Sequence, residues 1–218
     1  IRIKLHMPKN EKGEIRVMDK INQKTLEDYL FSHLTPTNMG ILLSLNTGLR
    51  IGEICALKWS DIDFQKAILK VNSTVSRVKS DDENSSKSKL IIDTPKTQSS
   101  IREIPIISQL MKPLIFLYET RNSEYIISAE TSFVSPRTFE YRFHTVLEKC
   151  RISPFNYHVL RHTFATRCIE GGVDIKSLSE ILGHANVSVT LNTYVHSSIE
   201  RKRELLEKIS ENTTESHK

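Results

Sequence analysis

The segment YHVLRHTFATRCIEGGVDIKSLSEILGHANVSVTLNTY, residues 157–194, decides the fold and the chemistry expected of this chain. Its apolar spacing and its glycines predict three short helices, at 156–170, at 174–182 and from about 188 onward. The two connections between these helices are only a few residues long, so the helices can fold back on one another. The side chains at their ends therefore come close together.

Four of those side chains suggest a reaction. His158 and Arg161 are three residues apart and hence neighbours on one helix face, His184 follows the helix-ending Gly183, and Tyr194 comes about two turns into the last helix. Such residues can bind a phosphate and attack it with a phenol, which predicts phosphoryl transfer through a covalent tyrosine. His158 and His162 are spaced like a zinc pair, but no HExxH glutamate or third ligand accompanies them, so we expect no metal and no cofactor.

The composition limits the class of protein to which the chain can belong. The chain has 218 residues, a net charge of +5 and a pI near 9.1, with 38% hydrophobic residues, as in a folded globular protein with a mildly basic surface. Its three cysteines, Cys55, Cys150 and Cys168, lack CxxC spacing, which favours a reducing, cytoplasmic setting. No apolar run approaches the length of a membrane span, so we expect no membrane association.

The rest of the chain predicts an α+β fold, mainly α-helical, with a small antiparallel β-sheet on one side. Helices are expected from a capping-box-like start at Thr25, from about Thr37 to Thr47, from Ile51 to Leu57, and from Ser108 to the end, with Ser135-Pro136 opening one of them. Strands are expected at 62–64, 68–71, 74–78, 90–92 and 101–107, and the polar segment 79–89 is expected to be a loop.

The chain divides into three segments. We expect residues 1–20 to be a linker that enters the domain, residues 21–210 to be one folded domain, and residues 211–218 to be a disordered tail. Near the end, Ile199, Leu205, Leu206 and Ile209 give a helix with an apolar stripe, which suits docking on a neighbouring protomer and packing on its own domain equally well.

Several motifs together resemble the tyrosine recombinases, the phage-integrase family. The similarity rests on four stretches in the family's order, which are TGLRIGE (47–53) with LKWSDI (57–62), TPKT (94–97), HVLRHTFAT (158–166), and LGH (182–184) with TY (193–194). It covers residues from about 20 to about 210, which implies that residues 21–210 are the catalytic domain and that residues 1–20 are a linker from an N-terminal core-binding domain that the chain lacks. The resemblance implies the catalytic set Arg50, Lys96, His158, Arg161, His184 and the nucleophile Tyr194, supported by Glu53.

The resemblance and the chemistry imply a role for each residue. The guanidiniums of Arg50 and Arg161 would hold the phosphate oxygens, His158 would accept the phenol proton, Lys96 would protonate the leaving 5′ oxygen, and His184 would donate to the phosphate. Glu53 would orient a basic neighbour. An arginine on a helix face is usually solvated, so Arg161→Ala is expected to abolish cleavage with little loss of stability. Further DNA contacts are expected from Lys87, Lys89, Arg137 and Arg142.

The implied reaction is site-specific recombination of double-stranded DNA. A 3′-phosphotyrosyl bond to Tyr194 conserves the energy of the broken phosphodiester, so rejoining needs neither ATP nor metal. The resemblance implies integration or excision by an enzyme of a phage or conjugative transposon, encoded by a bacterium or phage and acting on the chromosome. It also implies a homo-tetramer on DNA and a monomer in solution. The alternatives are a type IB topoisomerase-like relaxation of DNA and a DNA-binding module without catalysis.

Overall fold

The computed structural model describes residues 16–79, 88–94 and 97–194. Its eight helices within these ranges are α1 (Lys20–Ser32), α2 (Pro36–Thr47), α3 (Ile51–Ala56), α4 (Ser108–Glu119), α5 (Pro136–Lys149), α6 (Val159–Glu170), α7 (Ile175–Leu182) and α8 (Val187–Tyr194). The strands are β1 (Ile62–Asp63), β2 (Ile68–Val71), β3 (Thr74–Lys79), β4 (Ser88–Asp93) and β5 (Arg102–Pro105). The predicted mainly helical α+β class is confirmed.

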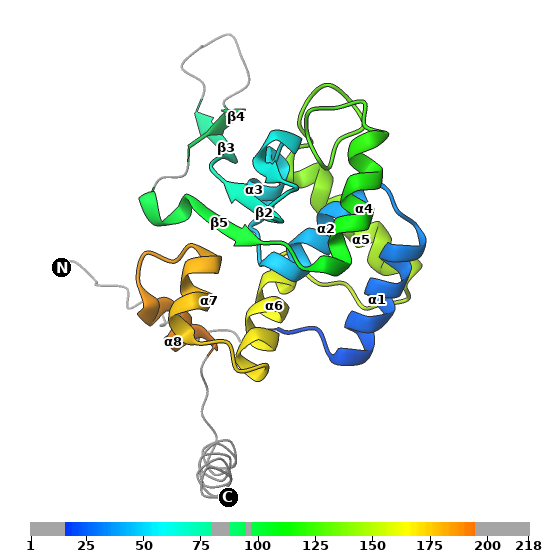
Figure 1. Ribbon diagram of the computed structural model, residues 1–218. Coiled ribbons are helices and arrows are strands. Elements are labelled where there is room, and N and C mark those ends of the chain that lie inside the picture. The colour runs from blue at the N-terminus through cyan, green and yellow to red at the C-terminus, as the bar shows by residue number, and fades with distance from the viewer. Residues whose placement is uncertain (1–15, 80–87, 95–96, 195–218) are drawn as a thin grey trace, which may run out of the picture.

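Helix α2 lies at the centre of the core because it is apolar on nearly every side. Met39, Ile41, Leu42 and Leu43 are all fully buried, and α1, α4, α5 and α6 pack around the helix (Figure 1). The Thr35 side chain accepts a hydrogen bond from the backbone N–H of Asn38 in the first turn, and Pro36 occupies the first helical position. Proline costs no hydrogen bond there, because the first N–H groups of a helix have no acceptor within it.

The strands form two sheets where the sequence predicted one. β1, β2 and β5 make a three-stranded antiparallel sheet in the order β1-β2-β5, and β3 and β4 make a separate hairpin. In the first sheet Val71 pairs with Arg102, which brings the start of β5 beside the end of β2. The hairpin stands beside α3 at one end of the molecule (Figure 1).

Two helix predictions were wrong. The first helix begins at Lys20, because Asp19 accepts the capping bond from Asn22, whereas Thr25 lies inside the helix and its hydroxyl donates back to the Ile21 carbonyl. Residues 121–134 are not helical. Ile126 there donates to the Leu57 carbonyl instead.

The packed domain begins before residue 21. Met18 is fully buried, its N–H donates to the Thr163 hydroxyl, and its carbonyl accepts from Arg167. The end of the segment predicted as a linker is thus bound to α6. The predicted C-terminal helix and tail lie outside the described residues.

Helices α7 and α8 form a small unit against α6 and β5, on the opposite side of the molecule from α4 (Figure 1). Their own apolar cluster is separate from the main core and consists of Ala165, Leu178, Leu182 and Tyr194, flanked by Phe164, Cys168 and Ile169. The unit that carries Tyr194 is therefore joined to the rest of the domain through few apolar side chains.

Gly48 ends α2 and packs against this unit. Its φ is +67°, and a Cβ built there would lie 2.7 Å from both Leu182 Cδ2 and Phe164 Cδ1. We expect Gly48→Ala to lower the free energy of unfolding by roughly 2–4 kcal/mol, from backbone strain plus the clash. Urea unfolding measures this loss.

Gly172 provides the matched control. It also has a positive φ, +85°, but a Cβ there would meet nothing within 4 Å. Gly172→Ala should therefore cost only the backbone strain, about 1 kcal/mol. Equal losses in the two variants would show that the contact with α6 and α7 is unimportant.

Candidate functional site

The turn between α2 and α3 positions the first basic residue. The left-handed Gly48 lets the chain reverse, and Arg50 then becomes the N-cap residue of α3. Glu53, in the first turn of α3, accepts from the Arg50 backbone N–H at 2.9 Å and from Arg50 Nη1 at 2.8 Å. Both bonds fix the direction in which the Arg50 side chain leaves the helix.

Glu53 also binds a second arginine that the sequence reasoning missed. Arg102, the first residue of β5, donates to both Glu53 oxygens, at 3.1 and 2.9 Å, and both side chains are buried. Burial raises the pKa of Glu53, but the hydrogen bonds and charges of Arg102 and Arg50 outweigh it, so the net pKa is lowered. Glu53 is therefore a carboxylate shared by two guanidiniums, and Arg102 joins α3 to the strand that follows Lys96 in sequence.

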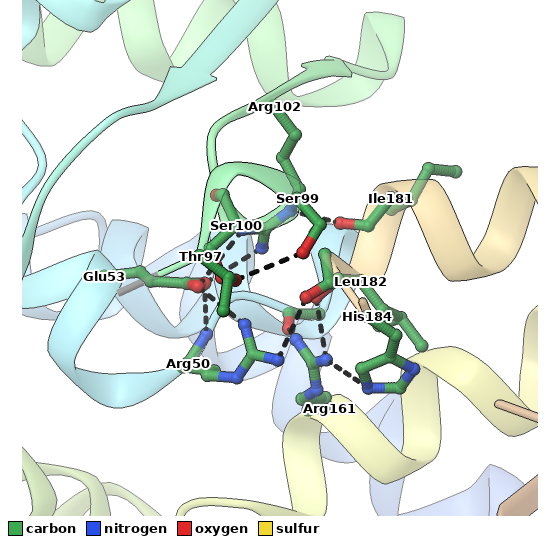
Figure 2. A network of polar contacts seen from close by, with 12 residues as sticks. Arg50, Glu53, Thr97, Ser99, Ser100, Arg102, Arg161, Ile181, Leu182 and His184 are labelled. Atoms are coloured by element: carbon green, nitrogen blue, oxygen red, sulfur yellow. Dashed lines mark hydrogen bonds and ion pairs between the residues drawn. The ribbon is translucent and has the colours of Figure 1, made fainter. Parts of the chain in front are cut away.

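Arg161 is buried beside them, with only 2% of its surface exposed. Its Nη1 donates to the Gly48 carbonyl at 2.7 Å, and its Nη2 to the Leu182 carbonyl at 2.8 Å (Figure 2). Burial, followed by the charge of Arg50, lowers the pKa of Arg161 to about 10, which leaves the guanidinium protonated at neutral pH. Arg161 is therefore not the solvated charge that is usual for an arginine on a helix face.

Three arginines meet the end of α7. The carbonyls of Ile181, Leu182 and Gly183 accept from Arg102 Nε, Arg161 Nη2 and Arg50 Nη2 respectively. The last carbonyls of a helix have no partner within the helix and carry its negative dipole end, so cations suit them. We name these three carbonyls the α7 terminus.

His184 follows the α7 terminus. Arg161 can only donate, so His184 Nε2, 2.8 Å from Arg161 Nη2, must accept, and Nδ1 then carries the proton and donates to the Thr190 hydroxyl at 2.7 Å. Burial and the charges of Arg161, Arg50 and Arg102 lower the pKa of His184 to about 4. In this arrangement His184 is neutral and anchors α8 through Thr190.

Tyr194 lies close to this group at the end of α8 and is 9% exposed. Burial raises the pKa of its phenol, although the charges of Arg161 and Arg50 act in the opposite direction. Its hydroxyl lies 3.0 Å from His162 Nδ1, so the structure places His162 against the phenol. The ring of His158 contacts His162 edge to face, with centroids 4.7 Å apart.

The remaining predicted residues divide into three cases. Arg137, at the first turn of α5, is exposed and lines a cavity of about 460 Å³ together with His158 and Arg77. Lys89 on β4 is exposed, whereas Arg142 turns toward α2 and lies 3.4 Å from the Thr37 hydroxyl. Lys87 and Lys96 lie outside the described residues.

Two negative observations concern the part of the chain that the structure describes. Its histidines, cysteines and carboxylates form no group of three or more that could hold a metal ion. None of its helices has the length and apolar character needed to cross a membrane.

The chain is similar in sequence to known proteins. The profile of the phage integrase family matches residues 14–201, so the chain belongs to that family. A "Tyrosine recombinase XerC-like" protein of Caldanaerobacter subterraneus subsp. tengcongensis is 35% identical over 188 residues, covering 78% of this chain. The chain spans 48% of that relative, about half its length.

Solved structures agree on the fold. The Tn1549 transposon integrase in complex with transposon right end DNA superposes with a TM-score of 0.74 at 22% identity, covering 92% of this chain and 68% of that one. A lambda integrase tetramer bound to a Holliday junction gives a TM-score of 0.57 at 19% identity, covering 82% of this chain and 48% of that one. The fold is therefore that of a tyrosine recombinase catalytic domain.

Proposed function

We propose that the chain is the catalytic part of a site-specific recombinase of the phage or conjugative transposon type. It cleaves and rejoins double-stranded DNA through a 3′-phosphotyrosyl bond to Tyr194. The observation that carries this proposal is the convergence of Arg50, Arg161 and His184 at the α7 terminus, close to a buried tyrosine. Family membership supports the same reaction.

The guanidiniums stabilise the charge that develops during the reaction. As the Tyr194 oxygen attacks phosphorus, negative charge grows on the non-bridging oxygens, and forked N–H donors match their geometry. Glu53 and the α7 terminus hold Arg50 and Arg161 at fixed positions for this role. A bound phosphate would also supply the negative charge that favours protonated His184, whose Nε2 would then give up the bond from Arg161 and donate to the phosphate.

The leaving group needs a proton. Departure of the 5′ oxygen as a hydroxyl requires a general acid, and Lys96 fills this role in the proposal, as the resemblance implies. His158 stays a predicted proton acceptor, with a pKa lowered to about 4 by partial burial and by the charges of His162, Arg161 and Arg50. It is therefore neutral at pH 7.

The proposal also includes the contacts to DNA and the oligomeric state. Arg137, which lines the cavity beside His158, and Lys89 on β4 are exposed cations and serve as contacts to the DNA backbone. The enzyme is a monomer in solution and a homo-tetramer on paired sites, in the cytoplasm of a bacterial host. The lambda integrase tetramer, which has the same fold, supports the assembly. Light scattering with and without paired sites tests it.

The test of the activity is a covalent adduct. We expect the protein to form a DNA adduct, stable to denaturation, on nicked duplexes taken from the DNA that flanks its gene. Tyr194→Phe removes the nucleophilic oxygen and should form none, while the buried ring keeps its packing. Gel electrophoresis under denaturing conditions measures the adduct.

Three outcomes would contradict the proposal. Equal adduct from the wild-type protein and Tyr194→Phe would exclude Tyr194 as the nucleophile. Relaxation of a supercoiled plasmid without exchange between paired sites would indicate the topoisomerase alternative. Absence of any adduct on every duplex would indicate a DNA-binding module.

A further inference from the structure

The contact between His162 and Tyr194 has a geometry suited to proton transfer. His162 lies on α6 one residue after Arg161, but it faces α8, whereas Arg161 faces the α7 terminus. Its Nδ1 is 3.0 Å from the Tyr194 hydroxyl, and the two ring centroids are 5.6 Å apart. A proton acceptor must lie within hydrogen-bond reach of the proton that it removes, and His162 does.

The surroundings of His162 favour a neutral ring. Among the residues that the structure describes, the titratable or charged groups that interact with it are His158 and Arg161 from its own helix and Tyr194 from α8. Partial burial, and then the charge of Arg161, lowers the pKa of His162. A neutral imidazole with its proton on Nε2 leaves the Nδ1 lone pair directed at the phenol.

The phenol itself needs such an acceptor. Burial raises the pKa of Tyr194 above its usual value near 10, and the arginine charges offset this effect only in part. Tyr194 is therefore fully protonated at neutral pH, and the protonated phenol is a poor nucleophile. A base in direct contact removes this obstacle without any movement of α8.

We propose that His162 is the catalytic residue that takes the proton from Tyr194 as its oxygen attacks the DNA phosphate. The inference rests on the proposed recombinase activity. The Tyr194 O–H bond breaks as its proton moves to His162 Nδ1, the oxygen forms a bond to phosphorus, and the bond from phosphorus to the 5′ oxygen breaks. The general acid gives its proton to that oxygen, and in the rejoining step both protons return.

This assignment gives His158 a different place. Its ring packs edge to face on His162. A positive charge on His162 lowers the pKa of His158, so the two rings are not protonated together. No described contact joins His158 to the Tyr194 hydroxyl. His158 therefore supports the orientation of His162 and is free to contact the phosphate from the side of the cavity that it lines.

The experiment uses two substitutions at His162. His162→Asn places an amide oxygen near the position of Nδ1 and can accept a hydrogen bond, but it cannot take up a proton. His162→Phe keeps a ring between His158 and Tyr194. We expect both to slow adduct formation on the nicked duplex by roughly 100-fold or more, the usual contribution of a general base. His33→Asn, which changes an exposed histidine on α1's C-terminal side, should retain the wild-type rate.

A second measurement separates proton transfer from positioning. With 3-fluorotyrosine at position 194 the phenol is more acidic and depends less on a base. The factor by which His162→Asn slows adduct formation should then be smaller by about tenfold or more. A defect of unchanged size would show that His162 only positions the phenol, and wild-type rates in both variants would exclude any role. If the wild-type protein itself forms no adduct, the proposed function fails instead.

Discussion

Arg161→Ala is expected to reduce covalent adduct formation by roughly 1,000-fold, because it removes a forked donor from the charge that develops on the phosphate. It should also destabilise the domain. The substitution leaves the Gly48 and Leu182 carbonyls and the His184 ring without their donor in a buried site. Each unsatisfied buried group costs about 1–3 kcal/mol, so the two buried carbonyls together should lower the free energy of unfolding by roughly 2–6 kcal/mol. Single-turnover cleavage and urea unfolding measure the two effects.

Arg161→Lys is the informative companion variant. Lysine keeps the charge but donates from a single nitrogen, whereas Arg161 contacts the Gly48 and Leu182 carbonyls through two different nitrogens, so lysine can satisfy only part of these contacts. We expect intermediate stability and a cleavage defect close to that of alanine. Unfolding of Arg161→Ala at the same urea concentration as the wild type would show that the buried contacts contribute no stability. The sequence-based prediction of little loss of stability would then be correct.

Glu53→Gln should also give a large loss of stability. It removes the negative charge between Arg50 and Arg102 and leaves Arg102, which is 9% exposed, without a counter-ion. Breaking a buried ion pair by removing one partner costs roughly 3–5 kcal/mol. Adduct formation should fall too, since Arg50 loses the bond that directs its side chain. Urea unfolding at pH 7 measures the loss of stability.

The pH dependence tests the same carboxylate. The pKa of Glu53 is lowered in the folded protein, so its contribution to stability is complete above the unfolded value near 4.5 and is lost as the pH falls through the lower folded pKa. The stability gap between wild type and Glu53→Gln should therefore narrow below about pH 4. Glu103→Gln is the control, since Glu103 pairs with Lys70 at an exposed site and should change stability by less than about 1 kcal/mol. A constant gap down to pH 3 would contradict the charge argument.

The sequence predicted the fold where local signals are strong. Helix α2 ends at Thr47, as the Thr47-Gly48 pair indicated, and β2 occupies the predicted residues 68–71. It did not predict that the strands divide into two sheets, because β2 pairs with β5, which is distant in sequence, while the β3–β4 hairpin between them forms its own sheet. The segment near Ile126 was misassigned for a similar reason, since its backbone partner is Leu57.

The sequence likewise identified only part of the candidate site. Arg50, Arg161 and His184 were identified from motifs, and the structure brings them together, but their roles stay predictions. Arg102 was missed because a charged residue at a strand end usually faces water, and only the buried Glu53 beside it reveals otherwise. His162 was considered only as a zinc ligand. Its contact with Tyr194 depends on how α8 folds back, which helical spacing alone does not specify.

The α7 terminus has a consequence for the entropy of anion binding. A free arginine side chain loses about 1.5–2 kcal/mol of rotamer freedom when it is held in one conformation. Arg50 and Arg161 are already held by carbonyls and by Glu53 before any phosphate arrives, so most of this loss occurs on folding. A phosphate that reaches them therefore meets ordered donors, and more of its interaction energy remains for the reaction.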